Sequence, residues 1–177
     1  MLFRSTASKF GKTLKRKSQP TPEFIRAICD PVDISNLPFV KYGRENEDKV
    51  ADMYVKKMHE EGNTGLRMAE VGLCVNPSLP HFVFDPMSND KFGGVEIKTN
   101  PKAGSMGLSI AQTVGHPSFT ANHFLVSKDG QIILNTDHSY YYQLQGQLDL
   151  SMLSWIDFVA HSGIRDIFKQ RMFPDKD

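Results

Sequence analysis

The sequence predicts one domain of mixed helix and strand, of the α/β or α+β class, over residues 1–177. Three observations lead to this prediction. A chain of 177 residues matches the usual size of a single domain. Its 40% hydrophobic and 23% charged residues are typical of globular proteins. Hydrophobic periods of helix and strand type alternate along the chain, so we expect a mixed central sheet flanked by helices.

Helix signals come first along the chain. Residues 5–14 fit a short helix. The next helix begins after Thr21, an N-cap residue with Pro22 at the first helical position, and Pro31 ends it.

After a loop punctuated by Pro38, residues 44–61 carry apolar side chains at three- and four-residue steps, which predicts an amphipathic helix. Gly62 and Asn63 close this helix. Further on, residues 108–114 fit a short helix and residues 138–150 a longer one.

Strand signals form two groups. In the first, prolines and polar turns separate short apolar runs, which suggests a meander of antiparallel strands. Its expected strands are residues 71–76, 81–85 and 92–99. The second group begins with a hairpin, because Asp129-Gly130 lies between two apolar runs. Its expected strands are residues 124–127, 131–134 and 155–160.

Basic residues gather before the first acidic residue, Glu23, although the net charge of the chain is only +1. This N-terminal segment, residues 1–20, can neutralise the phosphates of nucleic acid and would make binding depend on salt. On charge alone, a solvated terminus or a localisation signal explains it equally well. The basic residues are Arg4, Lys9, Lys12, Lys15, Arg16 and Lys17.

Two features bear on the compartment. No apolar run approaches the roughly 18–20 residues of a membrane span, and no secretory signal is visible. Cys29 and Cys74 are the two cysteines and lie far apart, which fits a reducing compartment. We therefore expect an intracellular protein without a membrane partner. Its place would be the nucleus or mitochondrion in a eukaryote, or the cytoplasm if the source is a phage or a bacterium.

The segment Gly94-Val95-Glu96-Ile97-Lys98 carries the most informative chemistry. In a strand, Glu96 and Lys98 point to the same face. An exposed ion pair worth about 0–1 kcal/mol is the ordinary explanation of such a pair. Asp85, which ends the preceding predicted strand, favours a different explanation, a metal site. Two facing carboxylates repel unless a cation lies between them.

A hydrolytic site follows from this second explanation. Asp85 and Glu96 would hold Mg²⁺ or Mn²⁺, which prefer hard oxygen ligands. Such an ion polarises a phosphodiester oxygen and activates water. Lys98 would orient or deprotonate that water and neutralise the charge that develops on the phosphate.

Two other charged residues, Glu47 and Lys102, each allow two interpretations from the sequence. Glu47 lies on the same side of its predicted helix as Val50 and Tyr54, where an unpaired charge costs free energy. It is either a rim glutamate paired with a lysine or a carboxylate that faces a cation or a positively charged site. Lys102, after the Glu96 strand, either contacts a phosphate backbone or only solvates its loop.

Several blocks, in the same order, resemble the lambda-type exonuclease or YqaJ viral recombinase branch of the PD-(D/E)xK nucleases. The resemblance covers most of the chain. Any one block is weak evidence, since E-x-K occurs by chance in many chains, but the ordered set is more specific. The blocks are the opening segment 4–11, the G-x-x-x-E-like helix start at 42–47, the E-x-K core at 95–98, the Y-x-x-Q-x-Q-like helix at 140–147, and the strand at 155–159.

The resemblance implies a restriction-endonuclease-like core with a defined set of site residues. It implies that Glu47 is a helix carboxylate near the metal, that the backbone carbonyl of Ile97 is a further ligand, and that Gln143 lies near the attacking water. It implies that the serine of the opening block, Ser8, helps to hold a terminal phosphate. The basic residues that we expect to bind DNA phosphates beside it are Arg4, Lys9, Lys12 and Lys102. It also implies 5′-to-3′ digestion of linear duplex DNA in recombination or repair, a homotrimer, and a single-strand annealing protein as partner.

One block departs from the family pattern. Where the family carries Ser-Pro-Asp-Gly, with the aspartate as a metal ligand, this chain has Phe84-Asp85-Pro86-Met87-Ser88. Aligning the prolines puts Met87 at the ligand position, and a thioether is a poor ligand for Mg²⁺. Either Asp85 reaches the metal through a shifted loop, or Asp90 substitutes, or catalysis has been lost.

We favour Asp85, because it directly ends a predicted strand, and expect a Mg²⁺-dependent deoxyribonuclease. The chief alternative is a catalytically inactive nuclease-fold module that binds DNA or a protein. A structure-specific endonuclease is a third reading.

Overall fold

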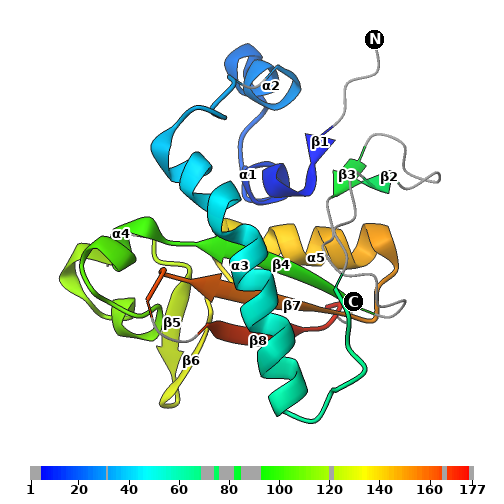
Figure 1. Ribbon diagram of the computed structural model, residues 1–177. Helices are drawn as coiled ribbons and strands as arrows, with labels where there is room; N and C mark the ends of the chain where they lie inside the picture. The colour runs from blue at the N-terminus through cyan, green and yellow to red at the C-terminus, as the bar shows by residue number, and fades with distance from the viewer. Residues whose placement is uncertain are drawn as a thin grey trace.

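A mixed three-stranded sheet lies at the centre of the computed structural model, which describes residues 5–30, 32–68, 74–75, 82–84, 93–119, 122–164 and 167–175. Strand β7 (Trp155–His161) lies in the middle of this sheet (Figure 1). It pairs in parallel with β4 (Gly93–Thr99) and antiparallel with β8 (Phe168–Met172). The predicted mixed sheet flanked by helices is confirmed.

The two faces of this sheet are covered by different helices, because successive side chains of a strand point to opposite sides. One face packs on α3 (Pro38–Glu60) and the other on α5 (Ser139–Ser151) (Figure 1). The core on the α3 side contains Val50, Tyr54, Met58, Val95, Ile97 and Val159. The core on the α5 side contains Leu144, Leu148, Ile156, Phe158 and Ala160.

Helix α3 is longer than the sequence pattern predicted. It begins at Pro38, where a loop was expected, because Leu37 is extended and proline suits the first helical position. The predicted end is confirmed: Gly62 has a φ of 98°, and the Asn63 N–H donates to the Met58 carbonyl at 2.9 Å. A left-handed glycine of this kind closes many helices.

Helix α5 and the hairpin before it agree with their predictions. The hairpin strands are β5 (Leu125–Lys128) and β6 (Gln131–Leu134), which pair antiparallel. Asp129 and Gly130, the two turn residues, have φ angles of 51° and 77°. Two consecutive left-handed residues match the twist of the flanking strands, which explains the Asp-Gly pair.

The N-terminal elements are β1 (Ser5–Thr6), the 3-10 turn η1 (Ala7–Lys9), α1 (Phe10–Leu14) and α2 (Pro22–Cys29). Of these, η1 and α1 pack on α5. The predicted cap of α2 is confirmed, since the Phe24 N–H donates to the Thr21 hydroxyl. A strand and a 3-10 turn replace the first half of the predicted 5–14 helix.

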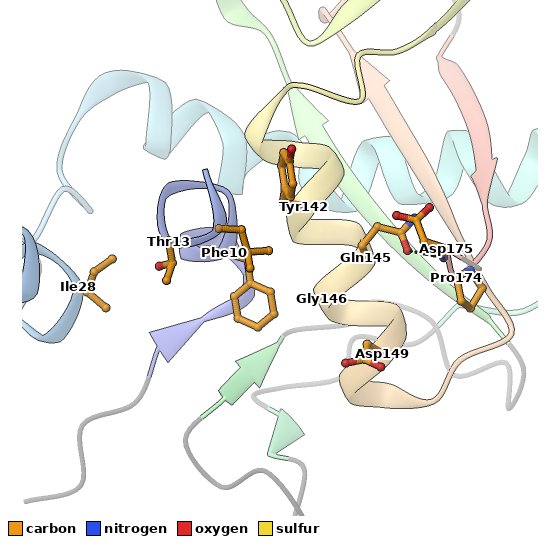
Figure 2. A pocket seen from close by; sticks show the side chains of 10 residues that line it. Phe10, Thr13, Ile28, Tyr142, Gln145, Gly146, Asp149, Pro174 and Asp175 are labelled. Atoms are coloured by element: carbon orange, nitrogen blue, oxygen red, sulfur yellow. Dashed lines mark hydrogen bonds between the residues drawn. The ribbon is translucent and has the colours of Figure 1, made fainter. Parts of the chain in front are cut away.

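Close packing of α1 on α5 explains a glycine inside a helix. A Cβ on Gly146 would lie 2.1 Å from Cδ2 of Phe10, so any larger residue would displace that ring. A cavity of about 590 Å³ lies beside this contact (Figure 2). Its lining includes Phe10, Thr13, Leu14, Ile28, Tyr142 and Pro174.

The predicted antiparallel meander is only partly correct. Strands β2 (Cys74–Val75) and β3 (Phe82–Phe84) do pair antiparallel, and β3 also pairs in parallel with β1. The expected third strand, β4, instead pairs with β7. Between β4 and β5 lie α4 (Pro101–Ser105) and the 3-10 turns η2 (Ala111–Thr113) and η3 (Pro117–Phe119), so the helix expected at 108–114 is a single short turn.

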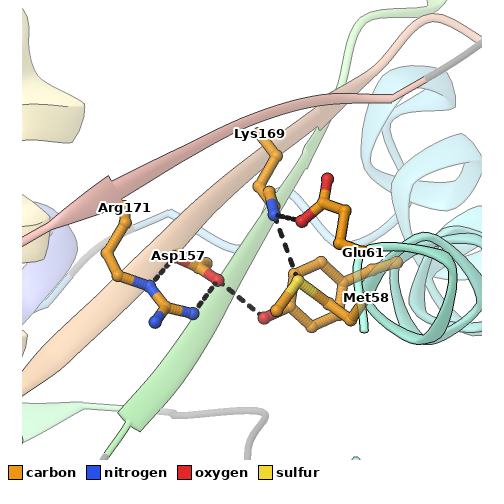
Figure 3. A network of polar contacts seen from close by, with 6 residues as sticks. Met58, Glu61, Asp157, Lys169 and Arg171 are labelled. Carbon is orange, nitrogen blue, oxygen red and sulfur yellow. Dashed lines mark hydrogen bonds and ion pairs between the residues drawn. The ribbon is translucent and has the colours of Figure 1, made fainter. Parts of the chain in front are cut away.

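Strand β8 was not predicted, and a buried charge explains its place. Asp157 on β7 is fully buried and accepts hydrogen bonds from Nε and Nη2 of Arg171 on β8, both at 2.8 Å (Figure 3). The Tyr54 hydroxyl on α3 donates to the same carboxylate at 2.7 Å. Burial, together with this hydrogen bond, raises the pKa of Tyr54, so its hydroxyl stays a donor. The network joins α3, β7 and β8.

No helix in the described part of the chain is both long and apolar enough to cross a membrane.

Replacing Tyr54 by Phe should lower the free energy of unfolding by about 1–3 kcal/mol, because a buried carboxylate loses one donor while the ring still packs. Tyr141→Phe is the matched control, since its hydroxyl donates to Asp175 at an exposed site, and it should cost far less. Urea unfolding of both variants measures the difference. Equal stabilities would contradict a stabilising role for the Asp157 network.

Candidate functional site

Glu96 is a buried carboxylate on the α5 side of β4. It is only 8% exposed, whereas its neighbours Val95 and Ile97 point to the opposite face and pack in the α3 core. The strand register places Glu96 opposite Phe158 of β7. A carboxylate buried at this depth requires hydrogen-bond donors, because burying an unpaired charge is very costly.

Three donors satisfy this carboxylate. Nε2 of Gln143 donates to Oε1 of Glu96, and Nε2 of Gln147 donates to Oε2, each at 2.7 Å. The two glutamines are one turn apart on α5, so both amides point to β4. The Lys98 ammonium lies 2.5 Å from Oε1 of Glu96. Hydrogen bonds that involve an ionised partner are the stronger ones, so this carboxylate is held firmly.

Lys98 occupies a site between negative groups and an aromatic ring. Its side chain is 25% exposed, and its ammonium lies 4.9 Å from the centre of the Tyr140 ring. Burial lowers the pKa of Lys98, but the negative charge of Glu96, with a smaller effect from Glu47, outweighs it and raises the pKa overall. The lysine is therefore held as an ammonium beside Glu96.

Glu47 contributes to the same charge cluster from another helix. It lies on α3 and is half-buried, and its negative charge acts on Lys98 of β4. The sequence left two readings of Glu47, a rim glutamate paired with a lysine or a carboxylate facing a positively charged site. In the structure the charge of Glu47 contributes to the raised pKa of Lys98, and a metal-binding role for Glu47 stays a prediction. Glu47, Glu96 and Lys98 thus form one group of charges.

Four residues weighed as site residues in the sequence lie outside the described residues, namely Arg4, Asp85, Met87 and Asp90. The predicted contact between Asp85 and Glu96 stays a prediction, although the two strands concerned are not neighbours where the structure describes them. Within the described ranges β3, the strand before Asp85, pairs with β1 and β2, whereas β4 pairs with β7. The third predicted metal ligand, the carbonyl of Ile97, belongs to β4 between Glu96 and Lys98.

The predicted phosphate-binding residues occupy two places. Ser8 and Lys9 belong to η1, and Lys12 is exposed on α1, all beside α5. Lys102 lies on α4, where its ammonium donates to the Ser118 carbonyl at 2.8 Å and lies 4.9 Å from the Phe119 ring. Lys102 therefore ties α4 to the η3 turn, a contact that neither sequence reading of this lysine foresaw.

Gln147 is the residue of this cluster that sequence reasoning missed. Its signal was present, because it follows Gln143 by four residues on a predicted helix and must share its face. Tyr140 packs against Phe158 and Phe124, and its ring lies next to Lys98.

The donor set of this cluster fits a hard divalent cation. Glu96 and Glu47 supply carboxylate oxygens, which Mg²⁺ and Mn²⁺ prefer. Oε1 of Gln147 is buried, and no donor among the described residues reaches it, so an acceptor oxygen beside Glu96 has no hydrogen bond. Across the described ranges no three Asp, Glu, His or Cys side chains gather into a metal-binding group. The predicted aspartate ligand falls outside those ranges.

Comparison with known proteins identifies the fold. No protein-family model and no curated protein matches the chain in sequence. A crystal structure of LHK-Exo in complex with dAMP matches with a TM-score of 0.63 and 22% identity, covering 98% of this chain and 79% of that one. A second structure, an alkaline exonuclease (LHK-Exo) from Laribacter hongkongensis, matches with a TM-score of 0.60 and 19% identity over the same shares.

At these identities the likeness shows the fold alone. The protein has the mixed α+β fold of an alkaline exonuclease, and the predicted resemblance to nucleases is confirmed at the level of fold. Membership in the viral recombinase branch stays a prediction.

Replacing Glu96 by Gln should lower the free energy of unfolding in EDTA by about 1–3 kcal/mol, because the half-buried Lys98 ammonium loses its carboxylate. Glu60→Gln serves as control. Glu60 pairs with Lys56 at 4.0 Å on the surface, where a pair contributes about 0–1 kcal/mol. Chemical denaturation measures both variants, and a Glu96→Gln protein as stable as the wild type would show that Lys98 does not depend on Glu96.

Proposed function

We propose that this protein is a Mg²⁺- or Mn²⁺-dependent DNA nuclease. The observation that carries the proposal is the Glu96–Lys98 pair on β4, in which Glu96 is buried and held by two glutamines of α5 while Lys98 is half-buried. An ion pair that served only solubility would be exposed. The fold shared with an alkaline exonuclease supports the same reading.

The proposed roles follow from the contacts of each residue. Glu96 and Glu47 would hold the ion, with the Ile97 carbonyl and Asp85, or Asp90 in its place, completing the ligand set. When bound, the ion polarises a phosphodiester oxygen and makes water a better nucleophile. Lys98, fixed by Glu96, would orient the attacking water and neutralise charge on the phosphate. Gln143 holds Glu96 through its Nε2, which leaves its carbonyl oxygen to orient water.

Finer features of the activity belong to this proposal as well. The substrate would be the end of linear duplex DNA, digested from the 5′ side in recombination or repair. Ser8, Lys9 and Lys12 on η1 and α1 would bind phosphates, together with Arg4 and Lys102. A homotrimer and a single-strand annealing partner are proposed on the family resemblance. LHK-Exo forms a complex with dAMP, and we extend nucleotide binding to this chain as part of the proposal.

Digestion of linear duplex DNA tests the activity. The wild type should degrade it with Mg²⁺ or Mn²⁺ and not with EDTA, and Lys98→Ala should lower the rate by about 10²–10⁴-fold, the usual contribution of such a group. Lys56→Ala, at a lysine whose side chain is 79% exposed on α3, should leave the rate unchanged.

The same assay separates the alternatives. Cleavage of closed circular DNA would identify an endonuclease. A wild type that shifts DNA in a gel without degrading it under any metal would establish the inactive binding module, which Met87 at the aligned ligand position would explain.

Salt dependence tests the N-terminal phosphate contacts. Each phosphate neutralised by a lysine contributes about 0.9 to the slope of log affinity against log salt, so Lys12→Gln should reduce that slope by about 1. Lys128→Gln, at an exposed residue of the β5–β6 hairpin, is the control. Fluorescence anisotropy with labelled duplex in Ca²⁺ measures both slopes, and an unchanged slope for Lys12→Gln would remove Lys12 from the interface.

A further inference from the structure

Gln147 is a buried residue with one polar atom that is hydrogen-bonded and one that, among the described residues, is not. It is only 2% exposed on α5, and its Nε2 donates to Oε2 of Glu96 at 2.7 Å. Its other polar atom, Oε1, is buried, and within the described parts of the chain no donor reaches it. A buried acceptor without a donor costs free energy, so such an atom calls for a partner.

The negative charge of Glu96 determines which polar atom of the Gln147 amide has no hydrogen-bond partner in the described part of the chain. Turning the Gln147 amide over would bring Oε1 against a carboxylate oxygen, and two acceptors repel. Nε2 must therefore face Glu96, and the unpartnered atom is the carbonyl oxygen. A carbonyl oxygen can accept a hydrogen bond from water or bind a hard cation.

Counting acceptor sites on Glu96 shows where an ion would bind. A carboxylate offers about four lone-pair positions, two on each oxygen. Oε1 already accepts from Lys98 and Gln143, whereas Oε2 accepts only from Gln147 among the described residues. Counting only contacts from the described residues, the oxygen with a free position is thus Oε2, the one that the Gln147 amide touches.

We propose that Gln147 is a positioning residue for the divalent ion of the proposed nuclease site. Its Nε2 holds Glu96 so that Oε2 is presented to the ion, and its Oε1 accepts a hydrogen bond from a water molecule of the ion's hydration shell. Mg²⁺ and its analogues keep several waters when bound to proteins, so such a donor is available. This inference rests on the proposed function, because it assumes that Glu96 binds an ion.

Titration with Mn²⁺, followed by electron paramagnetic resonance, tests the proposal on the full chain. Gln147→Met removes both polar atoms at similar volume and should weaken Mn²⁺ binding by about 10–100-fold, the usual effect of losing a residue that supports a metal ligand. Gln145→Met is the matched control. Gln145 lies on the same helix but bonds to the backbone of Phe173 and Asp175, so its loss should leave Mn²⁺ affinity unchanged.

A second variant covers the case in which Gln147→Met does not fold. Gln147→Glu keeps the size of the side chain but places a second carboxylate beside Glu96, and two carboxylates repel unless a cation lies between them. The midpoint of thermal unfolding of Gln147→Glu should therefore rise more on adding Mn²⁺ than that of the wild type. An equal rise would overturn the proposal.

The outcomes for this residue and for the whole site can be told apart. If the wild type binds Mn²⁺ and Gln147→Met binds it within about twofold, the role of Gln147 is wrong and the nuclease proposal stands. If the wild type binds no Mn²⁺, both are wrong.

Discussion

The site depends on one constraint: a carboxylate enclosed between a sheet and a helix must find donors there. Glu96 finds them on two elements, Lys98 two residues further along β4 and two glutamines one turn apart on α5. This arrangement requires α5 to lie across β4 with one face aligned to it. The packing of Leu144 and Leu148 on Phe158 maintains that alignment, because these buried residues fix the helix against the sheet. Apolar packing and charge satisfaction thus specify the same geometry.

The parts of the fold that could be predicted are those with local signals. Asp129-Gly130 specifies a tight hairpin by its own backbone preferences, Thr21-Pro22 starts a helix, and Gly62 ends one. Pairing between distant strands has no such local signal. The alternation of β4 shows which residues share a face, but nothing in it shows that β7, more than fifty residues later, is its neighbour. The predicted meander was wrong at β4 for that reason.

Strand β8 shows a second limit of sequence reasoning. Its segment Phe168-Lys169-Gln170-Arg171-Met172 has apolar residues only at its two ends and three long polar residues between them, a pattern typical of a surface segment. Arg171 belongs there because Asp157, across the strand pair, is fully buried. A buried acid and its partner can be recognised only when both positions are known in space.

The kind of site could be predicted from the sequence, but not all of the residues that form it. The spacing of Glu96 and Lys98 predicts a shared face, and the structure places them in contact. Gln143 entered only through a family resemblance, and Gln147 was missed although its spacing was readable. The acidic partner proposed from Asp85 stays a prediction, because Asp85 lies outside the described residues.

The opposite orientation of two neighbouring acids has a consequence for how the chain avoids misfolding. Asp157 lies opposite Val95 in the β4–β7 pair and faces α3, whereas Glu96 faces α5. A shift of β4 by one residue along β7 would point Glu96 and Lys98 into the hydrophobic core under α3. It would also point Val95 and Ile97 toward the amides of Gln143 and Gln147. Each such shift would bury charged side chains on the face of the sheet that packs on α3. Glu96 and Lys98, which we propose for the nuclease site, therefore also favour the correct register of the β4–β7 pair.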